Sequence, residues 1–417
     1  MWTTGIGGGL WTPGGPDGPA RPGQARPGYR SRMTPVFTRD RVTWVMYVVL
    51  GWFAYLQAAP GLVVPHLRDE LDLSYSTGGL HVAAFAAGSM AAGILTAPLE
   101  TAVGRRLLLW TAATLLGAGT VGLTAGTAAA VTIGSVLVMG LGGGLLIVTL
   151  QAVLSDQHGD FRTIALTEAN VSASVAYVVL IGALSLTAAL GLGWRTALLA
   201  SLAVPVLLWW RNRGLVLETP PPSATATGRL PRAFWVAAGI LVCTTAAEWC
   251  ITGWGSSFVE EAVDVSADRA VSLMIGYFGG VLVGRVVGSR LARRTDPARL
   301  LAAALVVSTV GFVALWPATT AVQAVAGLAL IGLGIGNLFP MGMSLAVSLA
   351  PDRAVLASGR AVTATSFAVL LAPLTVGAVA DATSLKTAMV AVPVFLALAA
   401  AGLAVVARVG TPVRIPS

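Results

Sequence analysis

Twelve apolar segments, most of them long enough to cross a lipid bilayer as helices, follow one another along this chain of 417 residues. A spanning helix needs about 20 mostly apolar residues. Charged residues make up only 11% of the chain and the mean hydropathy is +0.80, whereas about a quarter of a soluble domain is charged. The sequence therefore predicts an all-α polytopic membrane protein. The segments cover residues 42–64, 77–99, 107–126, 129–153, 164–190, 195–210, 233–259, 270–289, 299–317, 320–348, 358–380 and 386–407.

Basic residues alternate along the connections between these segments. Arginines occupy the N-terminal tail, the connections after the second, sixth and eighth segments, and the C-terminus, whereas the connections after the first and seventh segments are acidic. The positive-inside rule therefore predicts that both termini lie in the cytoplasm. The formal charge of +8 is spread over short loops and forms no contiguous basic patch. We therefore expect a lipid bilayer, and no nucleic acid, around this chain.

The second half of the chain repeats the first in the same order. Trp44 and Trp235 begin corresponding segments at an offset of 191 (235 − 44 = 191), and the same offset carries Gln57 onto Glu248. Two parallel six-helix repeats are the arrangement in which a substrate binds near mid-membrane between the halves, and rocking of the halves alternates access. Longer matches keep this offset or exceed it by one residue: VSAS (171–174) with VTAT (362–365), WRTA (194–197) with LKTA (385–388), and GLGGG (140–144) with GLGIG (332–336).

Composition divides the chain into five regions. Residues 1–40 are rich in Gly, Pro and Arg and predict a disordered cytoplasmic tail, in which Met33 is an alternative start to Met1. A polar, Pro-rich stretch suits a flexible connection between two halves. We expect an N-terminal six-helix half at 41–212, a cytoplasmic linker at 213–232, a C-terminal half at 233–408 and a second cytoplasmic tail at 409–417.

Glu248 lies near the middle of the seventh apolar segment. An ionisable side chain at that depth costs about 3 kcal/mol by insertion scales and usually faces the protein interior. Helical steps of three and four residues lead to Thr245 and Thr252, so the acid lies on a small, polar stripe of its helix. We interpret Glu248 as a proton carrier that loads and releases a proton as access alternates. The alternative is a neutral acid that hydrogen-bonds neighbouring helices.

Other polar and aromatic residues on the segments are candidates for contact with a solute. Gln57, the repeat mate of Glu248, offers an uncharged donor and acceptor to a hydroxyl or carbonyl group. An aromatic side chain such as Trp249 suits sugars or flat drugs. For each candidate the alternative is a role in packing, because polar side chains also join membrane helices. The predicted substrate-binding residues are Gln57, Asn170, Tyr177, Thr245, Trp249, Thr252 and Asn337.

Several motifs, together with the duplicated twelve spans, carry a resemblance to a known family. They are VGRR (103–106) after the second span, GLGGG in the fourth span and GLGWR (191–195) before the sixth. Over residues 35–410 the chain resembles the major facilitator superfamily, which implies a twelve-helix solute transporter. Within that family, AEWCITGW (247–254), GVLVGR (280–285) and GLGIGNLFP (332–340) are similar to the fucose-permease-like sugar branch.

The loop after the second span keeps only part of the family motif, which usually reads G-x-L-x-D-R-x-G-R-R. Gly104, Arg105 and Arg106 fit, while Ala97 replaces the first glycine and Thr101 the aspartate. The resemblance implies a cytoplasmic gate here, in which Glu100, one position before the missing aspartate, pairs with Arg105 and Arg106. Arg285 and Arg360, near the cytoplasmic ends of spans eight and eleven, are further gating candidates, and Arg285 can instead snorkel to the interface.

Other departures bear on the substrate. Val136 replaces an arginine that many members carry in span four, and Val178 and Val179 replace the Gly-Pro pair of drug antiporters in span five. Gln57 replaces the span-one acid of several proton-coupled sugar transporters. The missing Gly-Pro pair favours uptake, whereas the aromatic seventh span favours export of amphipathic compounds, so the direction stays open.

We therefore expect a secondary active transporter of a small organic solute, coupled to protons through Glu248, acting as a monomer in the plasma membrane of a bacterium. A passive uniporter and a proton-linked exporter are the alternatives. The three histidines have no partners at metal-ligand or catalytic-triad spacing, so we expect no enzyme, no metal and no cofactor.

Overall fold

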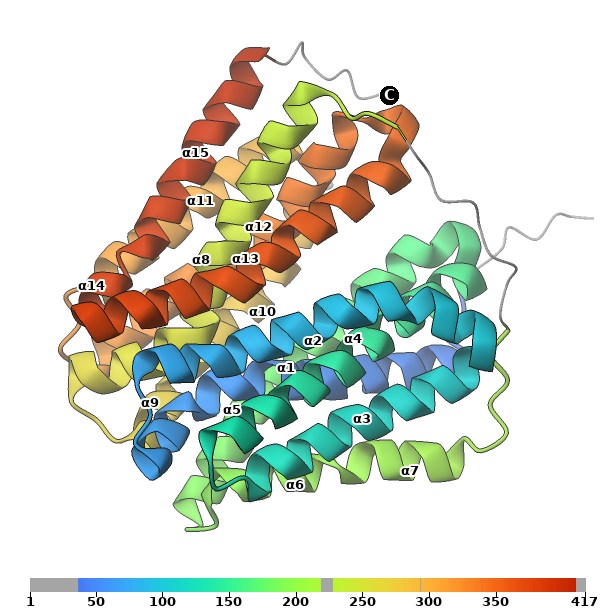
Figure 1. Ribbon diagram of the computed structural model, residues 1–417. Helices are drawn as coiled ribbons and strands as arrows, with labels where there is room; N and C mark the ends of the chain where they lie inside the picture. The colour runs from blue at the N-terminus through green and yellow to red at the C-terminus, as the bar shows by residue number, and fades with distance from the viewer. Residues whose placement is uncertain (1–36, 219–227, 293, 410–417) are drawn as a thin grey trace, which may run out of the picture. The chain divides into compact units, whose positions relative to one another are not determined.

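The computed structural model describes residues 37–218, 228–292 and 294–409. In these ranges the chain is helical apart from short connections (Figure 1), and twelve spans are long and apolar enough to cross a membrane, which confirms the prediction. The spans are α1 (Arg41–Leu71), α2 (Tyr75–Val103), α3 (Arg105–Ala125), α4 (Ala129–His158), α5 (Arg162–Ala189), α6 and α7 (Gly193–Ser201, Ala203–Arg211), α8 (Arg232–Val263), α9 and α10 (Ala267–Leu273, Ile275–Leu291), α11 (Pro297–Leu315), α12 (Ala321–Ser348), α13 (Ala354–Ala382), and α14 and α15 (Leu385–Ala388, Ala391–Val409).

Polar residues define where several of these helices begin. The side chain of Asp40 accepts from the Thr43 amide at the start of α1, and Ser74 does the same for Thr77 at the start of α2. Such caps satisfy amides that have no partner within the helix. The helices also extend past the apolar segments by several residues, because charged side chains at helix ends reach the membrane interface.

Three spans that the sequence predicts as continuous are each divided in two. Pro205 lies in the first turn of α7 and Pro393 in the first turn of α15. Because a proline has no backbone N–H, it cannot donate a hydrogen bond to a carbonyl oxygen of a preceding helical turn. The preceding helix therefore ends at Ser201 in one half and at Ala388 in the other. The third break, at Met274 between α9 and α10, contains no proline.

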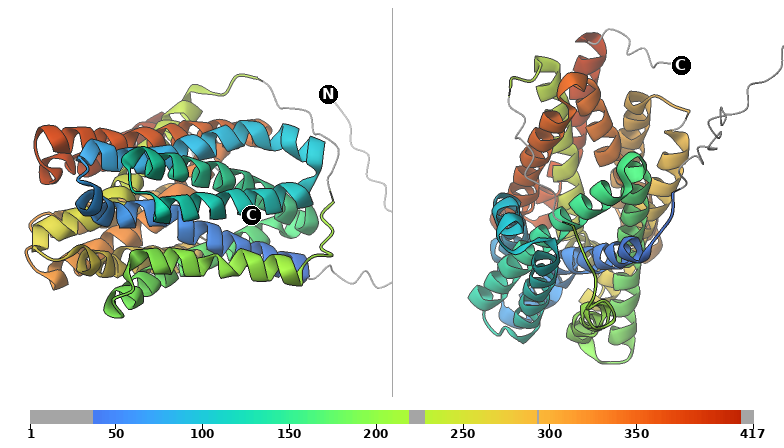
Figure 2. Two further views of the ribbon diagram at one scale, coloured as in Figure 1. Left: turned by 60° about the horizontal axis from the view of Figure 1, so that its bottom comes forward. Right: turned by 90° about the vertical axis from the view of Figure 1, so that its right-hand side faces the viewer.

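Each half is held together by close backbone contacts at its glycine-rich helix. A Cβ atom added at Gly140 of α4 would overlap the Phe85 carbonyl oxygen of α2. In the second half, a Cβ at Gly332 of α12 would overlap the Tyr277 carbonyl oxygen of α10. Both members of this contact are repeat mates at an offset of 192 (332 − 140 = 192; 277 − 85 = 192), so the duplication is present in the packing as well as in the sequence. In Figure 2 the helices of the first half are coloured blue to green and those of the second half yellow-green to red.

The two halves meet along three seams. Helix α1 packs against α8, α2 against α13, and α5 against α9 and α10. Helix α1 is central, with 89% of its most hydrophobic stretch buried, whereas α6 with α7 is peripheral, with 17% buried. We call the end of the bundle where α1 and α8 begin the tail end, and the end where they finish the far end.

The predicted region boundaries stay a prediction, and the helices can be placed beside them. Helix α7 ends at Arg211 and α8 begins at Arg232, close to the predicted limits of the linker. Most of the predicted tails, and linker residues 219–227, lie outside the described residues. The cytoplasmic position of the termini therefore stays a prediction.

Candidate functional site

A small cavity of about 30 Å³ lies between the two halves. It is open on one side and lined by charged, polar and aromatic side chains from four helices, two in each half. The lining residues are Gln57 and Ala58 of α1, Tyr177 of α5, Glu248, Trp249 and Thr252 of α8, and Tyr277, Phe278, Val281 and Arg285 of α10.

The crossing of α1 and α8 places two of the predicted residues in this cavity. At the crossing, a Cβ added at Gly61 would overlap the Thr252 carbonyl oxygen, and these two residues are themselves repeat mates (252 − 61 = 191). Gln57 and Glu248 each lie four residues, or one helical turn, before the crossing. The two backbones touch at the crossing, so they close the space on the far-end side of Gln57 and Glu248. Both side chains lie at the cavity.

The carboxyl group of Glu248 has no hydrogen-bond partner among the residues that the structure describes. Only its backbone carbonyl oxygen accepts, at 3.5 Å from the Tyr277 hydroxyl. Buried polar groups are normally hydrogen-bonded. An acid that is half-buried at mid-span and faces a cavity without a protein partner is free to bind a proton, water or a solute.

The opposite wall carries an amide with its donor atoms unused. The Tyr177 hydroxyl donates to Gln57 Oε1 at 3.1 Å. This bond orients the amide and leaves Gln57 Nε2 for a ligand. Tyr277 and Thr252 share a hydrogen bond of 3.2 Å, and the Tyr177 and Phe278 rings lie 5.2 Å apart, so aromatic faces surround the polar groups.

Arg285 lines this same cavity, although its position in the sequence predicted a gate nearer the membrane surface. Its Nη1 donates to the Ser174 hydroxyl at 2.7 Å, a bond from α10 in the second half to α5 in the first. Arg285 lies six residues before the end of α10 at Leu291 (291 − 285 = 6), and its side chain nevertheless lines the cavity.

Three of the predicted substrate residues are absent from the cavity lining. Asn170 is exposed and donates to the Leu166 carbonyl oxygen of its own helix at 2.8 Å. Asn337 joins α12 to α10 by donating to the Gly284 carbonyl oxygen at 2.8 Å, which is the alternative role in helix packing. Thr245 is buried, and its hydroxyl has no partner among the described residues.

A larger groove of about 1090 Å³ runs along α1, α5, α6 and α7 and has a different character. Most of its lining side chains are apolar, and its hydroxyl groups are satisfied within the protein. Ser172 donates to the Tyr47 carbonyl oxygen at 2.5 Å and Ser201 to the Leu198 carbonyl oxygen at 2.7 Å. The smaller cavity is therefore the better candidate site, because its polar groups are left for a solute.

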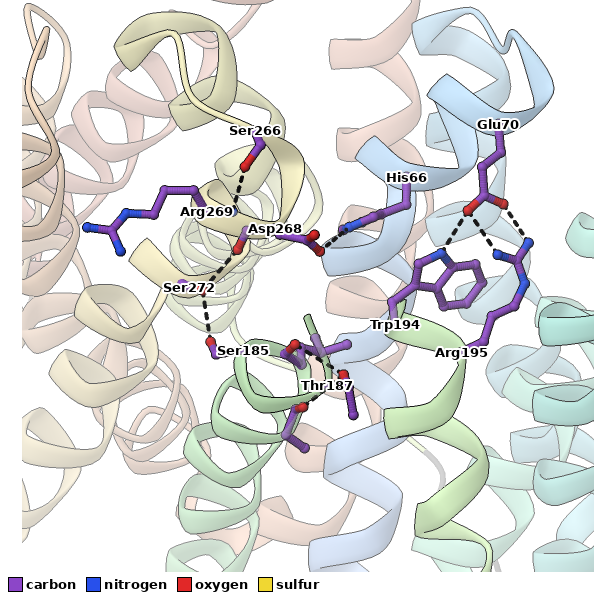
Figure 3. Close-up of polar contacts among 12 residues, drawn as sticks. His66, Glu70, Ser185, Thr187, Trp194, Arg195, Ser266, Asp268, Arg269 and Ser272 are labelled. Carbon is purple, nitrogen blue, oxygen red and sulfur yellow. Dashed lines mark hydrogen bonds and ion pairs between the residues drawn. The ribbon is translucent and has the colours of Figure 1, made fainter. Parts of the chain in front are cut away.

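Hydrogen bonds join the halves at the far end (Figure 3), where sequence reasoning had identified no contacts. His66 of α1 lies 2.8 Å from an oxygen of Asp268 on α9, and the Ser185 and Ser272 hydroxyls lie 2.9 Å apart between α5 and α9. These contacts lie beyond the α1–α8 crossing and hold the far end closed.

The carboxylate of Asp381, at the end of α13, caps the first turn of α2 in the other half. It accepts from the Tyr75 amide at 2.7 Å and from the Ser76 amide at 2.8 Å. A negative charge at a helix N-terminus is stabilised by the free amides and by the helix dipole. The Tyr75 hydroxyl also donates to Glu261 of α8, so α2 is tied to two helices of the second half. No local pattern indicates this contact, because its partners are about 300 residues apart.

The other predicted gating residues lie at the tail end. Glu100 accepts from Arg105 Nε at 2.6 Å, as the resemblance implied, and Arg105 also pairs with Asp156 of α4 at 2.7 Å. Arg106 and Arg360 are exposed, and Arg106 donates to the Arg213 carbonyl oxygen.

Two further contacts order the start of α1. Arg39 Nε donates to Glu168 Oε2 at 2.7 Å, and this carboxylate raises the pKa of the Arg39 guanidinium. Arg41 donates to Asn212 at 2.7 Å. Both contacts stay within the first half, so they attach the first turn of the central helix to α5 and to the end of α7.

Comparison with known proteins identifies the family. The family model for the Major Facilitator Superfamily matches residues 43–259 and again 237–416, one match for each six-helix half. The chain belongs to the major facilitator superfamily. An uncharacterised transporter of this superfamily from Yersinia pestis is 24% identical over 365 residues, which cover 84% of this chain and 92% of that protein.

Solved structures of the superfamily share the fold. A bacterial homologue of the human lysosomal transporter Spinster, in an inward-facing and unoccupied conformation, aligns with a TM-score of 0.71 at 14% identity, over 89% of this chain and 97% of that one. Its inward-facing, occupied conformation aligns with the same score at 15% identity, over 88% and 96% of the two chains. This major facilitator protein is therefore a membrane transporter of a solute, and the family works by alternating access.

Proposed function

We propose that this major facilitator protein is a secondary active transporter that moves a small organic solute across a bacterial plasma membrane and couples that movement to protons through Glu248. The observation that carries the proposal is the Glu248 carboxyl, which has no hydrogen-bond partner among the described residues and lies in a cavity between the halves. Ionisable groups inside a membrane protein mark proton and substrate pathways. A single chain supplies every wall of the cavity, which supports a monomer as the working unit.

Alternating access assigns each contact a place in the cycle. The far-end contacts of Asp268 and Asp381 join the halves in the described state, so opening at that end requires these bonds to break. If the arginine-rich tail end faces the cytoplasm, as its charges predict, this state is the inward-facing one. The proton on Glu248 is then exchanged with one side of the membrane at a time.

The experiment uses purified protein in proteoliposomes that contain a pH-sensitive dye. Sugars, organic acids and amphipathic drugs are added one at a time, with and without an imposed pH gradient. We expect the transported solute to accumulate only with the gradient and to carry protons with it. Glu248→Gln should abolish gradient-driven accumulation, while Glu218→Gln, the same change at an exposed position in the linker, should leave it intact.

The two alternatives give different results in the same assay. A uniporter would equilibrate the solute at the same final level with or without the gradient, and Glu248→Gln would leave that level unchanged. A proton-linked exporter would move protons and solute across the vesicle membrane in opposite directions. The dye would then report a pH change of the opposite sign. Accumulation by Glu248→Gln equal to the parent protein would remove the proton-carrying role of this residue.

A further inference from the structure

Two opposite charges line the cavity without contacting each other. Glu248 and Arg285 both line it, yet no ion pair within 4.0 Å joins them in the part of the chain that the structure describes. A guanidinium group has five N–H donors, of which the bond to Ser174 uses one. Arg285 therefore keeps donors for a ligand, and no carboxylate of residues 37–218, 228–292 or 294–409 is in direct contact with its charge.

The geometry points to an organic monocarboxylate as the solute that occupies this cavity, with its carboxylate bound to Arg285. This inference rests on the proposed transport function and specifies the class of substrate. A carboxylate matches the planar fork of donors on an arginine, and such pairs are stronger than hydrogen bonds between neutral groups. It would also supply the counter-charge that Arg285 lacks in the empty cavity.

The rest of the cavity indicates the body of such a solute. Aromatic rings cover the walls, with the Tyr277 and Phe278 rings 5.0 Å apart and Trp249 beside them. The free Gln57 amide adds one directional donor. The enclosed space in the described state is about 30 Å³, so a molecule with one ring or a short apolar chain next to its carboxylate binds only after the lining side chains move apart.

Protonation of Glu248 would control the charge that the solute meets. With Glu248 neutral, Arg285 gives the cavity a net positive charge and an anion is favoured. When Glu248 releases its proton to water, its carboxylate neutralises Arg285 across the cavity and the bound anion is disfavoured. One proton and one monocarboxylate therefore cross together, and no net charge moves.

Few other titratable groups face Glu248. Tyr177 and Tyr277 line the cavity with it, and α12, which packs on α8, carries no charged residue. The charged residues of α13 and α15 lie toward the ends of those helices, and those of α1 lie toward its two ends as well. Arg285 is therefore the cation that the acid and the solute share.

The test measures binding of matched ligands to the full-length protein in detergent. Benzoate, phenylacetate and hexanoate are each compared with their primary amides, which have nearly the same shape and no charge, by thermal shift and isothermal titration calorimetry at pH 5.5 and 8. We expect at least one carboxylate to bind, more tightly at pH 5.5, and its amide to bind at least tenfold more weakly.

Variants on α10 assign the binding to one residue. Arg285→Gln should weaken carboxylate binding at least tenfold, Arg285→Lys should retain part of it, and Arg290→Gln, an exposed arginine on the same helix, should have no effect. Arg285→Lys keeps the charge and provides a folded comparison if Arg285→Gln unfolds. Equal binding of acid and amide, unchanged binding by Arg285→Gln, or no binding of any carboxylate would overturn the inference.

Transport measurements keep this inference separate from the proposed function. If the pH gradient drives a neutral solute through Glu248, proton-coupled transport stands and the carboxylate inference fails. If a carboxylate binds through Arg285 but accumulates equally without a gradient, the substrate class stands and proton coupling fails. An imposed membrane potential without a pH gradient should drive no uptake, because the expected cycle moves no net charge.

Discussion

The cap that Asp381 places on α2 is expected to set how often the far end opens. Replacing it with alanine removes two hydrogen bonds, to the Tyr75 and Ser76 amides, and a negative charge at the helix N-terminus. An exposed charge in this position contributes about 0.3–1 kcal/mol. Because Asp381 is exposed, we discount its two bonds as well and expect a total loss of about 1 kcal/mol. That loss corresponds to about a fivefold rise in the ratio of open to closed molecules.

Spin labels across the far end measure that ratio directly. Cysteines introduced at the exposed positions Leu192 and Val322, one in each half, carry the labels in a background where Cys243 and Cys250 are alanine. Pulsed electron paramagnetic resonance then gives the distribution of distances between the halves. We expect Asp381→Ala to increase the long-distance population about fivefold relative to the parent.

A second far-end carboxylate provides the control. Glu70 binds Arg195 Nη1 at 2.9 Å and Trp194 Nε1 at 3.1 Å, but all three residues belong to the first half (Figure 3). Glu70→Ala should therefore leave the distance distribution unchanged. If Asp381→Ala has no effect, or if Glu70→Ala shifts the distribution equally, the bonds of Asp381 across the seam do not hold the far end closed.

Two further substitutions test the packing within each half. Gly332→Val should lower the melting temperature, since overpacking at a close backbone contact costs about 1–3 kcal/mol, whereas Gly279→Val, with open space around it, should not; equal melting curves would contradict the close contact. Arg105→Gln should destabilise the protein by about 1–3 kcal/mol, because it leaves the Glu100 and Asp156 carboxylates without their shared cation. Hydrogen exchange of the tail-end backbone amides, measured during unfolding in urea, reports this loss of stability. Exchange that is unchanged from the parent protein would exclude the predicted destabilisation.

The sequence was sufficient for the twelve spans and the duplication, because length, hydropathy and a fixed offset are local or periodic properties. The same offset predicted that Gln57 and Glu248 correspond, and both line the cavity. The breaks within three spans were not predicted. Pro205 and Pro393 give a usable signal for two of them, since proline favours the first turn of a helix, but the break at Met274 has no such signal.

The candidate site could be predicted only in part, because its geometry depends on which helices meet. Sequence position placed Arg285 near a membrane surface, whereas its side chain lines the cavity and donates to Ser174 of α5. Asn170 and Tyr177 were both predicted to bind the substrate, but Asn170 is exposed and donates to the Leu166 carbonyl oxygen of its own helix, outside the cavity lining. The bonds of Asp381 to α2 connect residues about 300 positions apart, and no pattern in a single sequence reports such a distance.

The matched glycine contacts at Gly140 and Gly332 give each half a rigid frame that does not depend on the residues facing the solute. Equivalent positions of the two repeats therefore carry an acid at position 248 and an amide at position 57, although the helix packing at the matched glycines is the same in both halves. A designer who wishes to change what this protein carries can leave the glycine scaffold untouched and alter only the few side chains between the two frames.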